Sequence, residues 1–170
     1  MEQMVQLNRL RISRFPTWMD VEIGTCGSNN EMLVKMSKVP NCIIGDTAHE
    51  VLESAIYLPP KRIVRLVKVS AFDLGFGVVA KQSELYNRAF DRGFRPAPLE
   101  LAPHLRIKYL NQPDGEWLRL GAYPVRDKYG KWRVLTIYCE FGQLYLHATS
   151  ADPETEYVEG DREWIFLQAE

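Results

Sequence analysis

Short segments of alternating apolar and polar residues, separated by turn residues, fill the second half of this chain and constrain its fold more than any other feature. Three turns stand out: Gln112-Pro113-Asp114-Gly115, Lys128-Tyr129-Gly130-Lys131 and the break at Gly142. Proline sets φ for the first corner of a turn, and glycine accepts the positive φ that other residues avoid. Strands are therefore predicted over 105–110, 116–123, 132–141, 143–148 and 163–167. Consecutive hairpins of this kind predict a mostly antiparallel, or mixed, sheet and hence an α+β fold.

The first half of the chain predicts about three helices among two strands. Residues 18–23 alternate as a half-buried strand does, and 63–72 are rich in β-branched residues. Ser28-Asn29-Asn30-Glu31 and Thr47-Ala48-His49-Glu50 both have the spacing of a capping box, in which a hydroxyl and a glutamate satisfy the first amides of a helix. The apolar stripe over 81–92, followed by Gly93, predicts a third helix. Residues 94–103, with three prolines, read as a loop.

Length and charge limit the class of protein. The chain has 170 residues, 46% hydrophobic residues and a formal net charge of −1. We expect a lead-in over 1–17 and one α+β domain over 18–170. Such a charge does not favour a strongly basic nucleic-acid binder, and such a hydrophobic content does not favour a disordered chain. No apolar run approaches the ~20 residues of a membrane span, and the start lacks the apolar core of a signal peptide, so no membrane partner is expected.

Cysteine and histidine are too few and too scattered to predict chemistry. Cys26, Cys42 and Cys139 form no C-x-x-C pair, which favours reduced thiols and a cytoplasmic location. The histidines show no metal-ligand spacing, and the motifs of phosphate loops, zinc proteases and serine hydrolases do not occur. The sequence therefore predicts no metal and no cofactor, leaves enzymatic activity undecided, and leans against it.

The densest group of polar residues lies between Pro96 and Arg119. If Pro113-Asp114-Gly115 closed a three-residue hairpin, Gln112 would lie opposite Glu116, and Arg106 would share their face. Glu100, at the end of the proline-rich loop, could lean over Arg106. A carboxylate–guanidinium–amide set of this kind suits a polar ligand or a peptide. An ordinary ion-paired sheet face remains the alternative.

The same region resembles a family of small bacterial proteins that are known only as uncharacterised. The resemblance rests on Asp73-Leu74-Gly75-Phe76, on 98–106 (Pro-Leu-Glu-Leu-Ala-Pro-His-Leu-Arg) and on 111–118 (Asn-Gln-Pro-Asp-Gly-Glu-Trp-Leu). This chain departs from the family pattern at Ala97, where the family has cysteine, and at Ala102 and His104, where it has glycine and glutamine. The resemblance implies no activity, but it directs attention to Glu100, Arg106, Gln112, Glu116 and Trp117.

Three functions remain open at this point. The first is a cytoplasmic, non-catalytic binding or accessory module that recognises a protein partner or a small polar ligand. The second is nucleic-acid binding through residues 81–149, which carry a net charge of +4 and offer Tyr129 and Trp132 for stacking. The cations of that segment would be Arg88, Arg92, Arg95, Arg126, Lys128, Lys131 and Arg133. The third is a hydrolase in which Glu100 or Glu116 acts as base and Arg106 steadies an anion.

The C-terminal segment has the opposite charge. Residues 150–170 carry a net charge of −6, which is typical of a solvated loop before a last strand. An electrostatic partner for a basic surface, within this chain or on another molecule, is the alternative.

Overall fold

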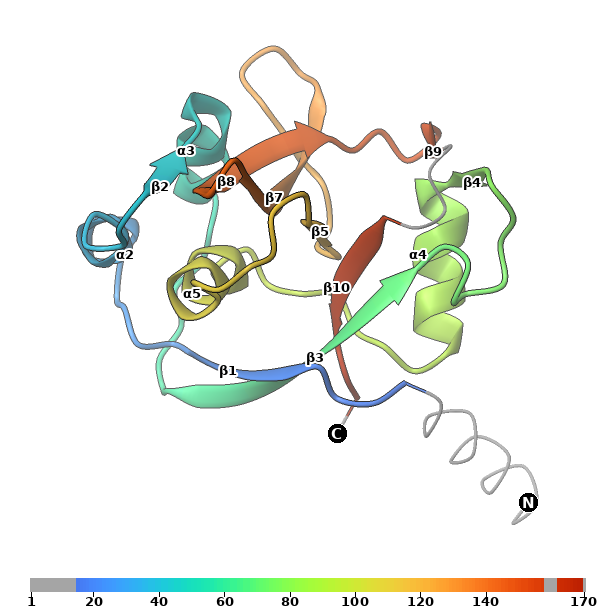
Figure 1. The fold of residues 1–170 in the computed structure, drawn as a ribbon, viewed down its shortest axis with the longest axis horizontal. Helices are drawn as coiled ribbons and strands as arrows, with labels where there is room; N and C mark the ends of the chain where they lie inside the picture. Colours follow the sequence, from blue (N-terminus) through green and yellow to red (C-terminus); the bar gives the residue numbers. More distant parts are fainter. Residues whose placement is uncertain (1–14, 158–161, 170) are drawn as a thin grey trace.

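The α+β class is confirmed by a computed structural model, which describes residues 15–157 and 162–169 (Figure 1). Within this part of the chain there are four helices: α2 (Asn29–Met36), α3 (Asp46–Glu53), α4 (Gln82–Asp91) and α5 (Leu101–Lys108). The longer strands are β1 (Met19–Ile23), β3 (Arg62–Ser70), β5 (Trp117–Leu120), β7 (Trp132–Glu140), β8 (Gln143–Ser150) and β10 (Glu163–Leu167). The short ones are β2 (Cys42–Ile44), β4 (Ala80–Lys81), β6 (Val125–Arg126) and β9 (Glu156–Tyr157).

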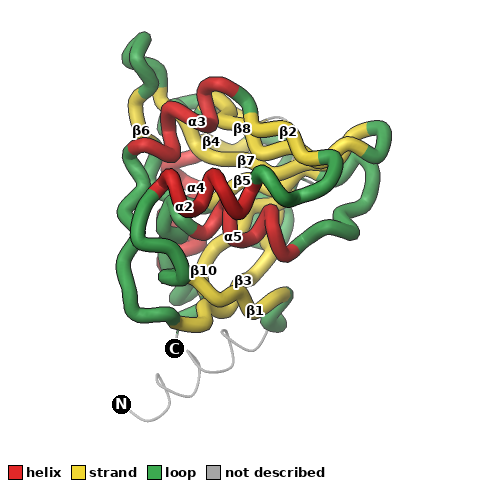
Figure 2. The backbone as a smooth tube through the Cα atoms, turned by 90° about the vertical axis from the view of Figure 1, so that its left-hand side faces the viewer, coloured by secondary structure: helices red, strands yellow, loops and turns green. Residues whose placement is uncertain are grey.

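One curled, mixed sheet organises the described chain (Figures 1 and 2). Its strand order is β1-β3-β10-β5-β7-β8-β2, with β6 added beside β7, while β4 and β9 form a separate two-stranded ladder. Most pairs are antiparallel, but β10 runs parallel to β5 and β2 runs parallel to β8. The last strand thus inserts between β3 and β5, so segments distant in sequence meet at the centre of the sheet.

The two faces of the sheet bury two separate apolar clusters. Helices α2, α3 and α5 pack on one face, where Leu66, Leu118, Ile137 and Ile165 lie beneath them. Helix α4 covers part of the other face, over Val67, Val69, Trp164 and Phe166. Adjacent residues of β3 and β10 belong to opposite clusters, because successive strand side chains point to opposite faces.

Several predicted elements are confirmed where local signals are strong. Strand β1, strand β3, helix α4 and the hairpin of β7 and β8 lie within two residues of their predicted bounds. The Ser28 hydroxyl caps α2 by accepting a hydrogen bond from the Glu31 amide. The Glu31 carboxylate accepts from the Gly27 amide at 2.7 Å, one residue before the position that a capping box predicts. Gly93 has φ +87, as the left-handed residue after α4 requires.

Three local predictions are wrong. Residues 105–110 form no strand, because α5 occupies Leu101–Lys108 and also replaces the end of the predicted loop. Pro113-Asp114-Gly115 is a turn with Gly115 at φ +83, but it joins a helix to β5 rather than two paired strands. Helix α3 is capped at Gly45, so the box predicted at Thr47–Glu50 lies inside the helix.

The burial of apolar side chains against the sheet explains why residues 101–108 form a helix. Leu101, Ala102 and Leu105 are buried against the sheet, at the spacing of one helical face. Pro103 lies in the first turn, where its missing amide breaks no helical hydrogen bond. The alternation of Leu105, Ile107 and Tyr109 fits a strand equally well. Strand β5 finds its partners in β7 and β10, which leaves residues 101–108 free to cover the sheet.

The predicted lead-in lies largely outside the described residues, which begin at Phe15. The ring of Phe15 packs edge-on against Phe94 at 5.2 Å and belongs to the cluster beneath α4. In the described part of the chain, no helix combines the length and apolar character needed to cross a membrane.

Candidate functional site: a cleft at the end of the sheet

The five residues singled out from the sequence do not form one patch. Glu100 is 1% exposed at the start of α5, where its carboxylate accepts hydrogen bonds from the Gly24 amide and from Arg62, each at 3.2 Å. The Nε2 atom of His104 lies 3.8 Å from the same carboxylate. These contacts tie α5 to the chain around β1 and β3. Glu100 is thus separated from the partners that the hairpin geometry assigned to it.

Arg106 and Gln112 do lie together, but inside the molecule. The Arg106 side chain is 0% exposed, and its guanidinium donates to the Gln112 amide oxygen and to the Tyr109 carbonyl. The Gln112 amide nitrogen in turn donates to the carbonyls of Glu116 and Ile137. This chain of bonds fastens the end of α5, through the turn, to strand β7.

Glu116 belongs to an ion cluster with Lys68. The Lys68 ammonium lies 2.7 Å from a Glu116 oxygen and 3.1 Å from a Glu163 oxygen, and 5.1 Å from the centre of the Trp18 ring. Burial lowers the pKa of Lys68, but the two carboxylates outweigh burial and raise it. Burial, together with the neighbouring Glu116, raises the pKa of Tyr109 to about 12. This cluster joins β3, β10 and the residue before β5, and Lys68 was not among the site residues predicted from the sequence.

Trp117 lies on the other face of the sheet in a stack of aromatic rings. Its ring is parallel to Tyr138 at 3.8 Å, and Tyr138 is stacked on Tyr145 at 4.5 Å. The Tyr138 hydroxyl is hydrogen-bonded to His147 at 3.0 Å, and Arg162 lies over the Trp117 ring. These rings face one another across adjacent strands, so they stabilise β5, β7 and β8 as cross-strand pairs.

A cleft of about 340 Å³ opens beside Gln112, where three connections meet at one end of the sheet. The α2–β2 loop, the α5–β5 turn and the β7–β8 hairpin supply its walls. The lining residues are Pro40, Asn41, Leu110, Gln112, Asp114, Cys139, Gly142 and Leu144. An Asp114 oxygen accepts a hydrogen bond from the Gly142 amide at 3.1 Å, which clamps the turn to the hairpin tip.

Several polar groups of this cleft are already engaged in the fold. Both functional atoms of the Gln112 amide have partners, and the Asn41 carbonyl accepts from the Leu144 amide at 2.8 Å. The Cys139 thiol is buried and lies 3.9 Å from Asp114. Leu110 is 48% exposed at the mouth. The cleft therefore offers another molecule the apolar side chains of Pro40, Leu110 and Leu144 alongside exposed polar atoms.

Phe141 stands next to the cleft, between the lining residues Cys139 and Gly142, and its side chain is 97% exposed. It forms the two-residue tip of the β7–β8 hairpin with Gly142, at φ +51 and φ +72 respectively. Two successive positive φ angles define the turn that suits a two-residue hairpin, and Asn-Gly is the pair that fits it best. A phenylalanine at the first position was not singled out from the sequence. Its one signal is the unusual Phe-Gly pair between two strand-like runs.

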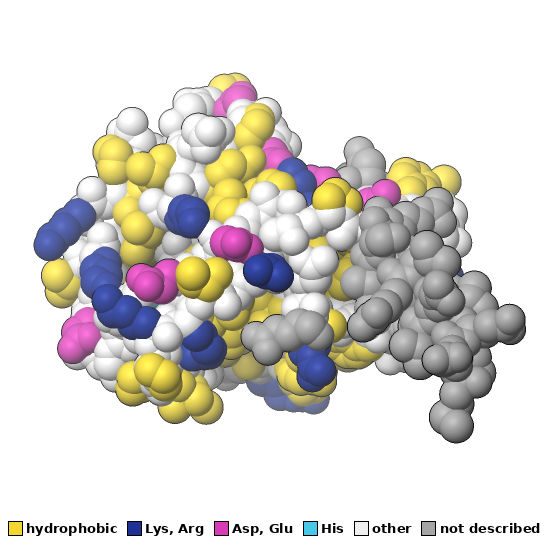
Figure 3. Space-filling model, turned by 90° about the horizontal axis from the view of Figure 1, so that it is seen from below, with side chains coloured by type: hydrophobic (Ala, Val, Ile, Leu, Met, Phe, Trp, Pro, Cys, Tyr) yellow, Lys and Arg dark blue, Asp and Glu magenta, His cyan; other side chains and the backbone are white. Residues whose placement is uncertain are grey.

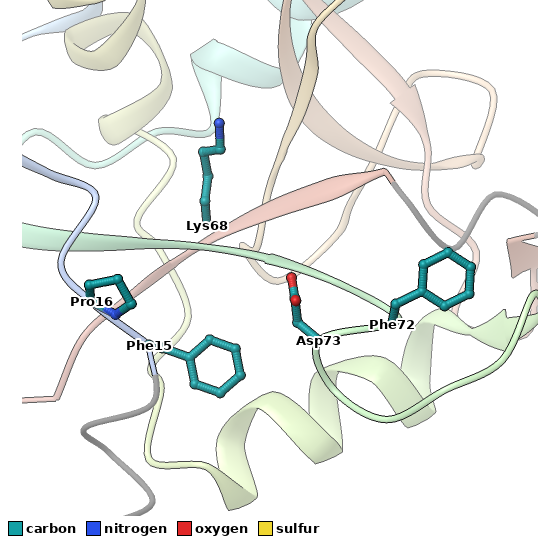
Figure 4. A pocket seen from close by; sticks show the side chains of 5 residues that line it. All are labelled: Phe15, Pro16, Lys68, Phe72 and Asp73. Carbon is teal, nitrogen blue, oxygen red and sulfur yellow. The ribbon is translucent and has the colours of Figure 1, made fainter.

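A second pocket, of about 370 Å³, borders β3 and is lined by Phe15, Pro16, Lys68, Phe72 and Asp73 (Figure 4). The Asp73 carboxylate accepts hydrogen bonds from the Ser70 amide and hydroxyl, at 2.8 Å and 2.9 Å. The Lys68 amine points away from Asp73 and Phe15 in Figure 4, toward its own carboxylate partners. The charged groups here are engaged in the fold.

The thiols and histidines carry no assembled chemistry in the described part of the chain. Cys42 in β2 and Cys139 in β7 both lie opposite Leu144 of β8. Burial raises the pKa of the Cys42 thiol, and the Arg106 guanidinium opposes this shift only in part. Among residues 15–157 and 162–169, no three side chains of histidine, cysteine, aspartate or glutamate gather as metal ligands would. Searches against protein families, curated proteins and solved structures found no match to this chain.

Proposed function

We propose that this protein is a non-catalytic binding module that captures an apolar side chain of a partner protein in the cleft beside Gln112, with Phe141 as the anchor at its edge. The exposure and backbone conformation of Phe141 carry this proposal. The site differs from the one expected from the sequence. Of the predicted residues Gln112 lines it, whereas Glu100 and Arg106 support the fold around it.

Phe141 destabilises the folded chain through its backbone conformation, and its exposed side chain does not offset this through burial. A left-handed backbone at a residue with a side chain costs roughly 1 kcal/mol, and glycine or asparagine would avoid most of that cost. A side chain that is 97% exposed gains nothing from burial in this chain. Local strain combined with an exposed aromatic ring is a common property of recognition surfaces. The ring is therefore best explained by a partner that covers it.

The chemistry of the cleft favours a protein segment over a small polar ligand. The side-chain amide of Gln112 and the backbone carbonyl of Asn41 are engaged, so a polar ligand that bound these groups would have to displace internal hydrogen bonds. Leu110 and Pro40 at the mouth, with Leu144 in the wall, favour an apolar side chain instead. An exposed aromatic ring beside a cleft that contains apolar side chains is an arrangement through which proteins take up an anchor residue of a partner.

The test uses a random-sequence peptide library displayed on phage, selected against the full chain. We expect selected peptides to share an apolar residue and to bind less tightly by about tenfold or more to the Phe141→Ala and Leu110→Ala variants in isothermal titration calorimetry. Tyr129→Ala is the matched control, because Tyr129 is also a highly exposed aromatic at a hairpin turn, but at a different site. It should bind these peptides as the unchanged chain does.

Two results would overturn the proposal. One is a selection that enriches no peptide. The other is a set of peptides whose affinity falls equally for Phe141→Ala and Tyr129→Ala, which would indicate nonspecific contact with exposed rings. Circular dichroism of each variant confirms that the fold is retained, and the exposed positions of these side chains make this the expected outcome.

A further inference from the structure

The β6–β7 hairpin projects from the body of the molecule (Figures 1 and 2), and its residues include several cations and aromatic rings. Residues 126–133 contain four cations and one carboxylate. Arg126, Lys128 and Lys131 are exposed, and the Tyr129 ring is 74% exposed at the turn. The Arg126 guanidinium lies 4.2 Å from the centre of the Trp132 ring, and the Lys128 amine lies 5.1 Å from that of Tyr129. Positive charge and stacking surface are thus presented together.

The turn holds this arrangement in place. The buried Asp127 carboxylate accepts hydrogen bonds from the amides of Tyr129 and Lys131, each at 2.9 Å, and from the Arg133 guanidinium at 2.8 Å. The Arg126 side chain donates to the Gly130 carbonyl at 2.8 Å. The Lys128 amide donates to Glu50 of α3, which anchors the turn to the body. A ligand would therefore meet a preformed surface, which lowers the entropic cost of binding.

The acidic C-terminal segment does not neutralise this hairpin through its described residues. Glu154 pairs with Lys81 at 2.9 Å, and Glu163 pairs with Lys68 at 3.1 Å. Among the described residues, Arg133 is the only one of the four hairpin cations with a carboxylate within 4.0 Å, and that carboxylate is Asp127. On the face seen from below, by contrast, basic and acidic side chains are intermixed (Figure 3).

We infer that the β6–β7 hairpin is a contact site for single-stranded nucleic acid, in which Tyr129 stacks on a base and Arg126, Lys128 and Lys131 meet the phosphates. A base needs an exposed ring face, and the phosphates on either side of it need cations within a few ångströms. The hairpin supplies both from one turn. Among the other cations of the basic middle segment, Arg88 donates to the Leu74 carbonyl and Arg92 lies over Phe15, and neither belongs to this hairpin.

The test measures fluorescence anisotropy of twelve-nucleotide oligothymidylate and oligouridylate with the full chain across salt concentrations. Three phosphate contacts to a single strand predict a slope of about −2 for log affinity against log salt. Tyr129→Ala should weaken binding roughly 5- to 150-fold, as loss of one stacked base does. The double change Lys128→Ala with Lys131→Ala should reduce the slope to about −0.7. A preference for either oligonucleotide shows whether the contact favours DNA or RNA.

Phe141→Ala is the control here and should bind oligonucleotides as the unchanged chain does, because Phe141 belongs to the other hairpin tip. The inference is overturned if neither oligonucleotide binds, or if Tyr129→Ala binds as tightly as the unchanged chain. It is also overturned if a blunt DNA duplex competes as well as the single strands, since a paired base cannot stack on Tyr129.

Discussion

At the scale of single residues, two buried polar side chains on α5 determine how the molecule responds to substitution and to pH. Arg106 is buried completely, and within the described residues no carboxylate lies within 4.0 Å of it. Its partners are the neutral oxygens of Gln112 and Tyr109. His104, two residues earlier, is buried beside Glu100. Both side chains connect α5 to its surroundings.

We expect Arg106→Met to lower the free energy of unfolding by about 2–4 kcal/mol. The change leaves two buried oxygens without their donor, each costing roughly 1–3 kcal/mol, while removal of a buried charge offsets part of that cost. Urea denaturation followed by circular dichroism measures the difference. Arg65→Met, at an exposed position, should stay within about 0.5 kcal/mol. Equal stability of Arg106→Met and the unchanged chain would show that Arg106 does not hold α5 to its turn.

His104 should make the protein less stable in mild acid. Burial lowers its pKa from 6.5 to about 4, so the unfolded chain takes up a proton before the folded chain does. The stabilisation from neutral His104 is complete above pH 6.5 and is lost as the pH falls toward 4. The loss is at most about 3 kcal/mol at 1.4 kcal/mol per pKa unit.

Chemical denaturation at pH 7.5 and pH 4.5 measures this loss in the unchanged chain and in His104→Gln. The variant should lose less stability between the two pH values, because glutamine does not titrate. His147, whose pKa burial also lowers, and the carboxylates remain in both proteins, so the difference isolates His104. An identical loss in both proteins would contradict the assignment.

At the scale of elements, the β7–β8 hairpin has a turn residue that lowers the stability of the hairpin instead of raising it. Strands β7 and β8 pair over eight positions, from Arg133 with Ser150 to Glu140 with Gln143. Their tip nonetheless carries a phenylalanine where asparagine would fit. The hydrogen bonds over these eight positions stabilise the hairpin enough to tolerate backbone strain at Phe141.

We expect Phe141→Asn to raise the free energy of unfolding by about 0.5–1 kcal/mol, since it produces the preferred pair for this turn. Thermal and urea denaturation measure the gain. The same variant should lose the peptides selected against the unchanged chain. A variant that is less stable than the unchanged chain would show that the Phe141 ring stabilises the hairpin, and would remove the main support for the proposed function.

At the scale of the whole molecule, two apolar clusters depend on the same two strands. Leu66 and Ile165 belong to the cluster beneath α2, α3 and α5, while Val67 and Trp164 belong to the cluster beneath α4. Neither cluster can lose its strands without exposing the other. One domain over 18–170 stays a prediction, and the two strands that both clusters share, β3 and β10, determine how it is tested.

We expect a single cooperative unfolding transition. Trp164 lies in the cluster beneath α4, and Trp18 packs against the other cluster, so the variants Trp164→Phe and Trp18→Phe give fluorescence weighted toward different clusters. Their midpoints of urea denaturation should each coincide with the midpoint from far-ultraviolet circular dichroism of the same variant. Separate midpoints would show that the two clusters unfold independently.

The sequence alone determined the elements whose signals are local. Ser28 and Glu31 mark the start of α2, Gly93 marks the end of α4, and the turn at 128–131 marks the β6–β7 hairpin. In each case the hydrogen bonds and backbone angles involve residues a few positions apart, so the residue types themselves reveal them. The cations and rings of the hairpin could be predicted as a group for the same reason.

Only the tertiary structure decided what residues 98–118 become and which side chains meet. Leu105, Ile107 and Tyr109 fit a strand or a helix, and the choice depends on β10, which inserts beside β5 from about 45 residues further along the chain. That insertion places Glu116 beside Lys68, and Arg106 becomes buried beneath the turn that follows α5. The cleft beside Gln112 is formed by three separate connections, so it exists only once the sheet has assembled.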